Sequence, residues 1–432
     1  MYFLYSFFLV AYFLVVLPFF VYRTLRHGNV VGRIKDRLGF MPDKFNPDQQ
    51  RSIWIHAVSV GEVLAARSLL ADLRRIYPTH QLFISTTTVT GQQLAHHLDE
   101  RIDGTFYIPL DFSSIVNRTL NRVLPDLLVL IDTEIWPNLL RLCHRSGVRT
   151  VLLNGRISDR SYKRYRLTRM FMRRVFENLD HVCAQNEVWA QRFLDLGVPI
   201  DRITVSGSLK FDAVEVASVD SHTENDVMAL FRFAANRPVL IAASTLRGEE
   251  ATILASFSQI LKTHHDALLI IAPRHPERFE ETRRLAIEHG FEVVRRSDLV
   301  PDRAPTANVI LLNTIGELAK IFKISTVVFV GGSLVKAGGH NILEPAVFGK
   351  AVVFGPYMQN FSKIAEMFVK AGAAWQVSSA KELEDALIAL LDDPIKRSNL
   401  GLAAQSLVEV NRGAKDRSLE IIARLLPSSI TS

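Results

Sequence analysis

Short apolar runs alternate with amphipathic stretches along most of the chain. Ile53 to Val58 has the length and character of a buried strand, Glu62 to Tyr77 has helical periodicity, and Leu82 to Thr86 again looks like a strand. Pro78 marks the end of that first helix. Because strand and helix alternate in this way, we expect a parallel sheet whose two faces are covered by helices.

The same pattern predicts the other elements of two such sheets. For the first sheet we expect helices at 91–98, 137–146 and 163–177 and strands at 127–131, 150–153, 181–184 and 203–205. For the second we expect strands at 239–243, 267–272, 292–295, 309–312, 327–330 and 351–354 and helices at 249–263 and 276–289. The polar segment 214–226 is typical of an interdomain linker, so we expect one domain over 23–213 and another over 227–432.

The first residues differ from the rest, because no charged side chain lies between Tyr2 and Tyr22. Such a run can span roughly 30 Å of hydrocarbon as a helix. Basic residues follow at once, which places the body of the chain in the cytoplasm. We expect an uncleaved single-pass transmembrane anchor over residues 1–22. The alternative is a cleaved secretory signal, but no basic residue precedes the run and no small-residue cleavage site follows it.

The charge of the chain indicates an anionic partner. The 432-residue chain has a formal net charge of +7, which suits nucleic acid, anionic lipid or a phosphorylated substrate. Beside an anchor, lipid is the favoured partner, and no basic, aromatic-lined motif for nucleic acid is present. Basic and apolar residues interleave over 163–174, a pattern typical of a helix on an anionic bilayer or around a phosphorylated head group; a solvated helix face is the alternative.

A glycine-rich loop follows the predicted strand at 327–330. It runs from Gly331 to Pro345, and in α/β proteins such a loop presents free backbone N–H groups to a phosphate. Gly338 and Gly339 would allow close approach of a ligand, and Asn341 would cap a following helix. Glu344 would then receive ribose hydroxyls. The alternative is a plain glycine turn with a glutamate favoured by the helix dipole.

Two carboxylates follow predicted strands in the first domain. Glu62 stands where a strand ends and a helix begins, and Glu134 stands beside Trp136 after the strand at 127–131. A carboxylate at such a place can take a proton from a sugar hydroxyl, or bind the sugar. A first-turn glutamate that stabilises a helix dipole is the alternative for both.

Cations and hydroxyl groups follow other strands. Arg156 and Lys210 do so in the first domain, and the segments Ser244 to Glu249 and Arg274 to Arg278 in the second. Together they would stabilise an acidic sugar and a departing phosphate. His275 and His340 lack the spacing of metal ligands, so we expect neither a metal nor a cofactor. Two cysteines, Cys143 and Cys183, are too few for a disulfide framework.

Five segments in combination resemble the bacterial 3-deoxy-D-manno-octulosonic acid (Kdo) transferases of lipopolysaccharide assembly. They are Trp54–Glu62, Thr133–Asn138, Gly207–Asp212, Ala272–Pro276 and Gly331–Pro345. The resemblance implies a glycosyltransferase of GT-B type, with two Rossmann-like domains facing a cleft. It further implies a metal-independent, inverting transfer from CMP-Kdo to a lipid A precursor at the inner membrane, with the catalytic domains on its cytoplasmic face.

By that resemblance Glu62 matches the general base, and Arg274, Gly339, Asn341 and Glu344 match segments that hold the CMP part of the donor. The remaining candidates are assigned by their place. Glu134 is a second catalytic candidate; His275, Ser333, Gly338 and His340 are candidates for donor binding; Ser59, Arg156, Lys210 and Ser244 are candidates for the acceptor or the Kdo carboxylate.

Two positions depart from the family pattern. Ile131-Asp132 stands where a Met-Glu pair is common, and Gly155 stands where alanine is common. Both lie near the expected acceptor side. Two other functions remain open: a GT-B transferase that uses another sugar nucleotide and a lipid acceptor, and a non-catalytic, membrane-anchored nucleotide-binding protein.

Overall fold

A computed structural model describes residues 1–27, 34–42, 45–98, 102–214, 227–301 and 303–427, and of residues 17–27 it gives the helical backbone alone. The chain forms two compact units. Unit 1 comprises Met1–Ala213 and Arg412–Ser432, and unit 2 comprises Val214–Asn411. Nearly all of the linker expected at 214–226 lies outside the described residues.

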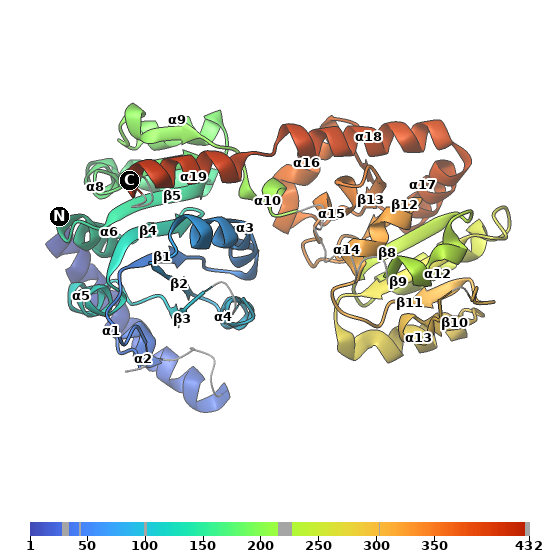
Figure 1. Ribbon diagram of the computed structural model, residues 1–432, viewed down its shortest axis with the longest axis horizontal. Coiled ribbons are helices and arrows are strands. Elements are labelled where there is room, and N and C mark those ends of the chain that lie inside the picture. The colour runs from blue at the N-terminus through green and yellow to red at the C-terminus, as the bar shows by residue number, and fades with distance from the viewer. Residues whose placement is uncertain (28–33, 43–44, 99–101, 215–226, 302, 428–432) are drawn as a thin grey trace. The chain divides into compact units, whose positions relative to one another are not determined.

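Unit 1 is built on a seven-stranded, all-parallel sheet in the order β3-β2-β1-β4-β5-β6-β7 (Figure 1). Its strands are β1 (Ser52–His56), β2 (Gln81–Thr86), β3 (Gly104–Tyr107), β4 (Pro125–Ile131), β5 (Arg149–Gly155), β6 (His181–Ala184) and β7 (Ile203–Val205). Its helices of eight residues or more are α1 (Tyr2–His27), α3 (Val60–Ile76), α4 (Val89–His96), α5 (Ser113–Val123), α6 (Pro137–Arg145), α7 (Asp159–Leu167), α8 (Arg169–Phe176), α9 (Glu187–Asp195) and α19 (Ala414–Leu425); α2 (Ile34–Arg37) and α10 (Leu209–Asp212) are single turns.

Unit 2 contains a second seven-stranded parallel sheet, in the order β10-β11-β9-β8-β12-β13-β14. Its strands are β8 (Val239–Thr245), β9 (Leu268–Pro273), β10 (Val293–Arg295), β11 (Val309–Leu311), β12 (Val327–Val330), β13 (Ala351–Phe354) and β14 (Trp375–Gln376). Its helices are α12 (Glu249–Ile260), α13 (Phe279–Glu288), α14 (Leu318–Ile321), α15 (Leu343–Ala346), α16 (Ser362–Lys370), α17 (Ala380–Asp392) and α18 (Pro394–Val410).

Both faces of the first sheet are apolar, as parallel strands require. Along β1, Ile53 and Ile55 contribute to one buried cluster and Trp54 to the other. A strand whose two faces are both covered reads as a continuous apolar run, because successive side chains point to opposite faces and neither face meets water. The α/β architecture expected from the alternation of apolar runs and amphipathic stretches is therefore present in both units.

The C-terminal helix does not belong to the second unit, so the expected domain 227–432 is wrong at its end. Helix α19 packs on unit 1, where Ala414, Ile421 and Ile422 join the same buried cluster as Ile53 and Ile55. The carboxylate of Asp212 accepts hydrogen bonds from the backbone of Gly413 (2.7 Å) and Lys415 (2.9 Å). These bonds fix the start of α19 beside α10.

Several elements were not predicted. Strand β3 is only four residues long, and α5 is a polar helix with one narrow apolar stripe, so neither stands out as an apolar run. After residue 354 the chain adds β14 and the helices α16 to α19, for which the apolar runs gave no expectation. The segment expected to be one helix at 163–177 is two helices, α7 and α8, that meet at Thr168.

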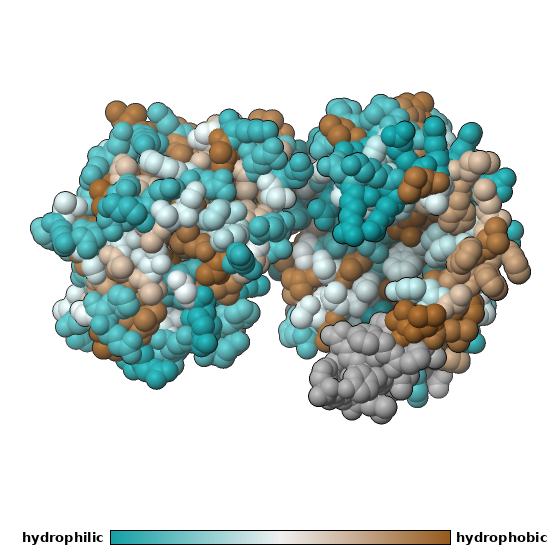
Figure 2. Space-filling model, turned by 180° about the vertical axis from the view of Figure 1, so that it is seen from behind, coloured by the Kyte–Doolittle hydropathy of each residue, from teal (hydrophilic) through white to brown (hydrophobic). Residues whose placement is uncertain are grey.

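The apolar N-terminal run forms α1, and this helix is attached to unit 1 along one side. The hydroxyl of Tyr5 donates to Asp111 (2.9 Å), and the Tyr5 ring stacks on Phe171. Other large apolar side chains of α1 are exposed, among them Phe3, Phe7, Phe8 and Val15. In the view of Figure 2, apolar side chains also gather on one flank of unit 1.

Among the residues that the structure describes, no helix has both the length and the apolar character needed to cross a bilayer. The transmembrane anchor expected over residues 1–22 therefore has no support in the structure, and the side chains of 17–22 lie outside the described part.

A helical glycine provides a test of the packing of unit 2, and a second one, in unit 1, provides the control. A Cβ at Gly401 in α18 would collide with the carbonyl oxygen of Gly349, whereas a Cβ at Gly61 in α3 would meet nothing within 4 Å. We expect Gly401→Ala to lower the free energy of unfolding by about 1–3 kcal/mol, because overpacking outweighs the better helix propensity of alanine. Gly61→Ala should cause no loss. Urea unfolding followed by circular dichroism measures both, and equal stabilities of Gly401→Ala and wild type would contradict the packing.

Candidate active site

The two carboxylates of unit 1 meet at the point where its strand order reverses. Strands β1 and β4 are neighbours in the sheet although two strands separate them in sequence, and the following loops diverge there. In open α/β sheets this is where ligands bind. Glu62 follows β1 in the first turn of α3, and Glu134 follows β4. The two predicted strand-end carboxylates therefore belong to one site.

Glu62 is held by its own helix start. One carboxylate oxygen accepts from the backbone N–H of Val58 (2.6 Å) and the other from the Ser59 hydroxyl (3.1 Å). The helix-start role that we weighed as the alternative is thus real. Burial, reinforced by the negative charge of Asp132, nevertheless raises the pKa of Glu62. A half-buried carboxylate with a raised pKa is a stronger base than a solvated one, so both roles are compatible.

Glu134 is more strongly perturbed. Burial, followed by the charge of Glu62, raises the pKa of Glu134 to about 7. Beside it, His56 is fully buried, and burial lowers the pKa of His56 to about 4, so its ring is neutral at pH 7. Nδ1 of His56 lies 3.1 Å from the carbonyl oxygen of Ser85 and 2.9 Å from the Ser85 hydroxyl. Nε2 lies 4.0 Å from the Glu134 carboxylate and has no hydrogen-bond partner among the described residues.

Asp132 and Arg156 form an ion pair beside these carboxylates. Nη2 of Arg156 lies 3.0 Å from Asp132, and Nε donates to the same oxygen at 3.1 Å. The Asn154 side chain donates to the other oxygen of Asp132. Asp132 and Asn154 both have positive φ, at 60° and 58°, a conformation that carries a cost and is typical of functional strand ends. Asp132, which departs from the family pattern, therefore orients the side chain of Arg156.

Lys210 completes the cluster from α10, the single helical turn that follows β7. Burial lowers the pKa of Lys210, and the charge of Arg156 acts in the same direction, while Asp132 and Glu62 oppose both. The charges of Arg156, Asp132 and Glu62 thus all act on its ammonium group. The structure thus brings Ser59, Glu62, Glu134, Arg156 and Lys210 together in unit 1. The second departure, Gly155, has a packing cause, because a Cβ there would lie 3.1 Å from the ring of Phe193.

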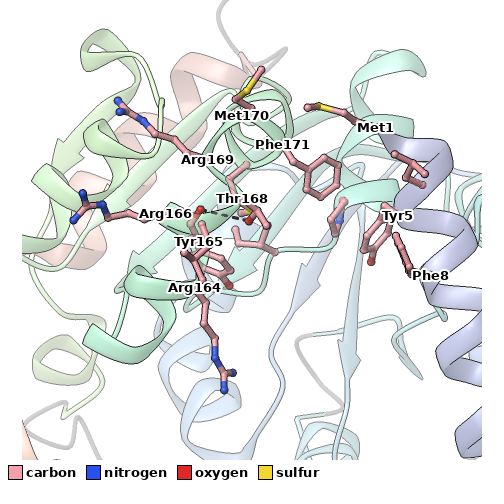
Figure 3. Close-up of a pocket in the computed structure, with 15 residues that line it drawn as sticks. Met1, Tyr5, Phe8, Arg164, Tyr165, Arg166, Thr168, Arg169, Met170 and Phe171 are labelled. Carbon is pink, nitrogen blue, oxygen red and sulfur yellow. Dashed lines mark hydrogen bonds between the residues drawn. The ribbon is translucent and has the colours of Figure 1, made fainter.

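An apolar pocket of ≈ 900 Å³ adjoins this cluster between α1, α7 and α8. Figure 3 shows Tyr5 and Phe171 facing one another inside it, whereas the guanidinium groups of Arg166 and Arg169 point away from α1. Tyr165 and Ile135 line the same pocket. Burial raises the pKa of Tyr165, and the charge of Glu134 raises it further by a smaller amount. Sequence reasoning marked the basic and apolar pattern of 163–174 but not the contribution of α1.

The glycine-rich loop of unit 2 differs from our expectation in its first half. The backbone N–H groups of Gly332, Ser333 and Leu334 donate to the carboxylate of Glu249 at 2.7, 3.0 and 2.9 Å. They are therefore not free to bind a phosphate. The Ser333 hydroxyl is also buried, where it donates to the carbonyl of Val330 and accepts from Gly355 N–H (2.8 Å). Ser333 shapes the loop and is closed to direct contact with a ligand.

The second half of the loop is arranged as expected in part. Oδ1 of Asn341 accepts from the N–H of Leu343 (3.1 Å), and its amide donates to Glu344 (3.1 Å). The helix that follows, α15, is a single turn, and its N-cap residue is Ile342, so the capping expected of Asn341 is wrong. Gly338 and Gly339 have φ of 94° and 73°, and a Cβ on either would strike Asn360 or Met358. Glycine is thus required there by packing as well as by conformation.

Four further donor-binding candidates lie close together at the carboxyl edge of the second sheet. Burial lowers the pKa of His340 to about 4, with smaller contributions from Arg274 and His275, and Arg274 opposes the rise that burial causes in the pKa of Glu344. Arg274 and His275 are exposed. Ser244 lies at the end of β8, with φ of 55°, and belongs to unit 2.

Within the described parts of the chain, no three histidine, cysteine, aspartate or glutamate side chains lie close enough to hold a metal ion.

Known protein families match ranges in both units. Residues 32–213 match the family described as 3-deoxy-D-manno-octulosonic-acid transferase (kdotransferase), and residues 236–407 match glycosyl transferases group 1. The structure of UDP-GlcNAc 2-epimerase from Neisseria meningitidis has 14% sequence identity, covers 87% of this chain and 99% of that one, and superimposes with a TM-score of 0.57, which shows a shared fold.

Full-length relatives are more similar in sequence. The 3-deoxy-D-manno-octulosonic acid transferase of Haemophilus influenzae is 35% identical over 412 residues, 92% of each chain. The enzyme of the same name from Bordetella pertussis is 32% identical over 380 residues, 86% of each chain. The protein is therefore a glycosyltransferase and belongs to the 3-deoxy-D-manno-octulosonic acid transferase family.

Proposed function

We propose that the enzyme transfers Kdo from CMP-Kdo to a lipid A precursor with inversion, and that Glu62 is the general base. The observation that carries this proposal is the cluster at the carboxyl edge of β1, β4 and β5. There a half-buried glutamate of raised pKa lies beside the Arg156–Asp132 pair and Lys210. A base next to cations suits an anionic sugar acid and a hydroxyl that must lose its proton.

In the proposed reaction Glu62 takes the proton of an acceptor hydroxyl as that oxygen forms a bond to the anomeric carbon of Kdo. The bond from this carbon to the phosphate oxygen of CMP breaks, and CMP leaves with the electron pair. Attack from the opposite face inverts the anomeric centre in one step. Arg156 or Lys210 would pair with the Kdo carboxylate, and Ser59 or Ser244 would contact the sugars.

Donor binding is proposed for unit 2. Arg274 supplies an exposed positive charge near His340 and Glu344. His275, Gly338, Gly339 and Asn341 belong to the same strand-end loops. The loop's second half would receive the CMP phosphate, and Glu344 would accept from ribose hydroxyls, because a carboxylate is an acceptor-rich partner for a diol. Ser333 would act through the shape of the loop.

Acceptor binding is proposed for the pocket between α1, α7 and α8. Its lining is mainly apolar and suits acyl chains, and Arg164, Arg166 and Arg169 supply cations at its margin for phosphate groups of the lipid. Association with the inner membrane would follow from the exposed apolar side chains of α1 and the basic α7 and α8, which favour an anionic lipid surface.

A conservative substitution tests the proposed base. Glu62→Gln keeps the size of the side chain but cannot accept a proton, so we expect transfer from CMP-Kdo to a tetraacylated lipid A precursor to fall roughly 10²- to 10⁴-fold with CMP affinity unchanged. Mass spectrometry of the lipid product measures transfer. Glu280→Gln, an exposed glutamate of unit 2, is the control. A wild-type rate in Glu62→Gln would exclude Glu62 as the general base. If the wild-type protein used another sugar nucleotide but not CMP-Kdo, CMP-Kdo would be excluded as the donor.

The raised pKa of Glu134 predicts a pH dependence. Below about pH 7 Glu134 is protonated and neutral, and above it the group becomes an anion beside Glu62. Because both proposed substrates are anionic, we expect kcat/KM of wild type to decline as pH rises through 7. Glu134→Gln, which stays neutral, should abolish this decline. The pH profile of kcat/KM for CMP-Kdo, measured for both proteins at saturating acceptor, tests this prediction. An unchanged decline in the variant would show that another group causes the decline.

The acceptor pocket can be tested with charges on its apolar rim. Leu167 and Met170 line the pocket and are 86% and 75% exposed. Leu167→Asp with Met170→Asp should raise the acceptor KM about tenfold or more, because buried acyl carbons would meet two carboxylates, and leave the KM for CMP-Kdo unchanged. Val188→Asp, an exposed apolar position of α9 outside the pocket, is the matched control. An unaltered acceptor KM in the double variant would place the lipid elsewhere.

A further inference from the structure

Glu249 occupies the place in unit 2 where an open α/β sheet would normally admit a ligand. Strands β8 and β12 are adjacent at the reversal of the strand order. Glu249, in the first turn of α12 after β8, is completely buried. Its carboxylate lies between the loops that follow these two strands. No ligand can enter there while the side chain remains.

The carboxylate is satisfied entirely by backbone. It accepts from Leu246 N–H (2.9 Å) in the first loop, and from the consecutive N–H groups of Gly332, Ser333 and Leu334 in the second. Consecutive N–H groups that converge on one anion form the cradle that phosphates use in other α/β proteins. Burial raises the pKa of Glu249, but the four backbone donors act against this rise, because they favour the charged form.

The fixed first half of the loop determines where the second half lies. The carbonyl of Gly332 accepts from Gly339 N–H at 2.8 Å, and a Cβ on Gly332 would meet the His340 ring. The carbonyl of Ser333 accepts from Tyr357 N–H at 2.9 Å. A shift of Gly332 would therefore move Gly339 and His340, which belong to the proposed donor site.

The neighbouring Glu250 secures the other loop of that site. It is also buried, and it pairs with Nη1 of Arg278 (2.6 Å) and accepts from the Thr245 hydroxyl (3.0 Å). The carbonyl of Thr245 in turn accepts from Arg274 N–H (3.0 Å). The start of α12 thus supports both segments that carry donor-binding candidates.

We propose that Glu249 is a built-in anion that fills the first N–H cradle of the glycine-rich loop, and thereby positions Gly339 and His340 to receive the phosphate of the nucleotide sugar. It is a positioning residue without direct contact with the donor. The inference rests on the proposed function, since it presumes a CMP-linked donor in unit 2. It assigns part of the affinity for the donor to a side chain that no ligand touches.

Removal of the carboxylate, and its replacement from solution, provide the test on the full-length protein. In Glu249→Ala the cradle is vacant, so we expect the Kd for CMP and the KM for CMP-Kdo to rise roughly tenfold or more, with kcat at saturating donor affected less. Added formate should fill the cradle and restore much of the CMP affinity. It should have no such effect on wild type, whose cradle is occupied.

Two controls separate positioning from stability. Glu249→Gln keeps the volume but turns one oxygen into an N–H₂ group facing backbone donors, so it should also weaken CMP binding and should resist rescue by formate. If Glu249→Ala does not fold, Glu249→Gln provides the test instead. Glu280→Ala removes an exposed glutamate paired with Arg283 and Arg295, and should leave CMP affinity unchanged.

The outcomes are distinct. Wild-type CMP affinity in the folded Glu249 variants would overturn the inference and leave the proposed function intact. Loss of affinity in Glu249→Ala without rescue by formate would also overturn it, because a vacant cradle must accept a small carboxylate. If wild type itself binds no CMP, the proposed function fails, and the inference fails with it.

Discussion

Burial of both faces of each parallel sheet is the constraint on which the rest of this structure depends. Neither face can carry an unpaired polar side chain without a large cost, so the chemistry is confined to the loops at the carboxyl ends of the strands. At that edge the backbone leaves regular geometry, as Asp132, Asn154 and Ser244 show by their positive φ. The ladders between β5 and β6 and between β8 and β9 shift register near the last two of these residues. Local irregularity therefore marks the strand ends from which the Arg156 loop and the segment leading to Glu249 continue.

The two units use the same local device for different purposes. In each, the strand at the reversal of the sheet order is followed by a helix with a glutamate in its first turn, Glu62 in α3 and Glu249 in α12. Both carboxylates accept from a backbone N–H three or four residues earlier. Glu62 keeps part of its surface open and lies among charged neighbours, whereas Glu249 is sealed by three further N–H groups of another loop. Exposure, rather than residue type or helix position, separates a candidate base from an internal support.

Residue patterns predicted the strands well, because a doubly covered strand such as β4 is a continuous apolar run. They also brought Glu62, Glu134, Arg156 and Lys210 to one edge, since parallel strands share that edge. They failed where the deciding contact is between residues distant in sequence: Glu249 lies more than eighty positions before the N–H groups it binds, and α19 packs on the opposite end of the chain. Length and hydropathy alone likewise suggested a membrane-spanning helix at residues 1–22. They could not show that the Tyr5 hydroxyl donates to Asp111 and that the Tyr5 ring stacks on Phe171.

The return of α19 to unit 1 has a consequence for biosynthesis. Ala414, Ile421 and Ile422 complete a cluster whose other members include residues of β1, β4 and α3, and the hydroxyl of Tyr77 donates to the carbonyl of Leu426. A ribosome releases these residues only after all of unit 2 has been made. Domains usually fold in the order of their synthesis. Here one face of the first unit's sheet gains its last covering helix only after unit 2 has been synthesised.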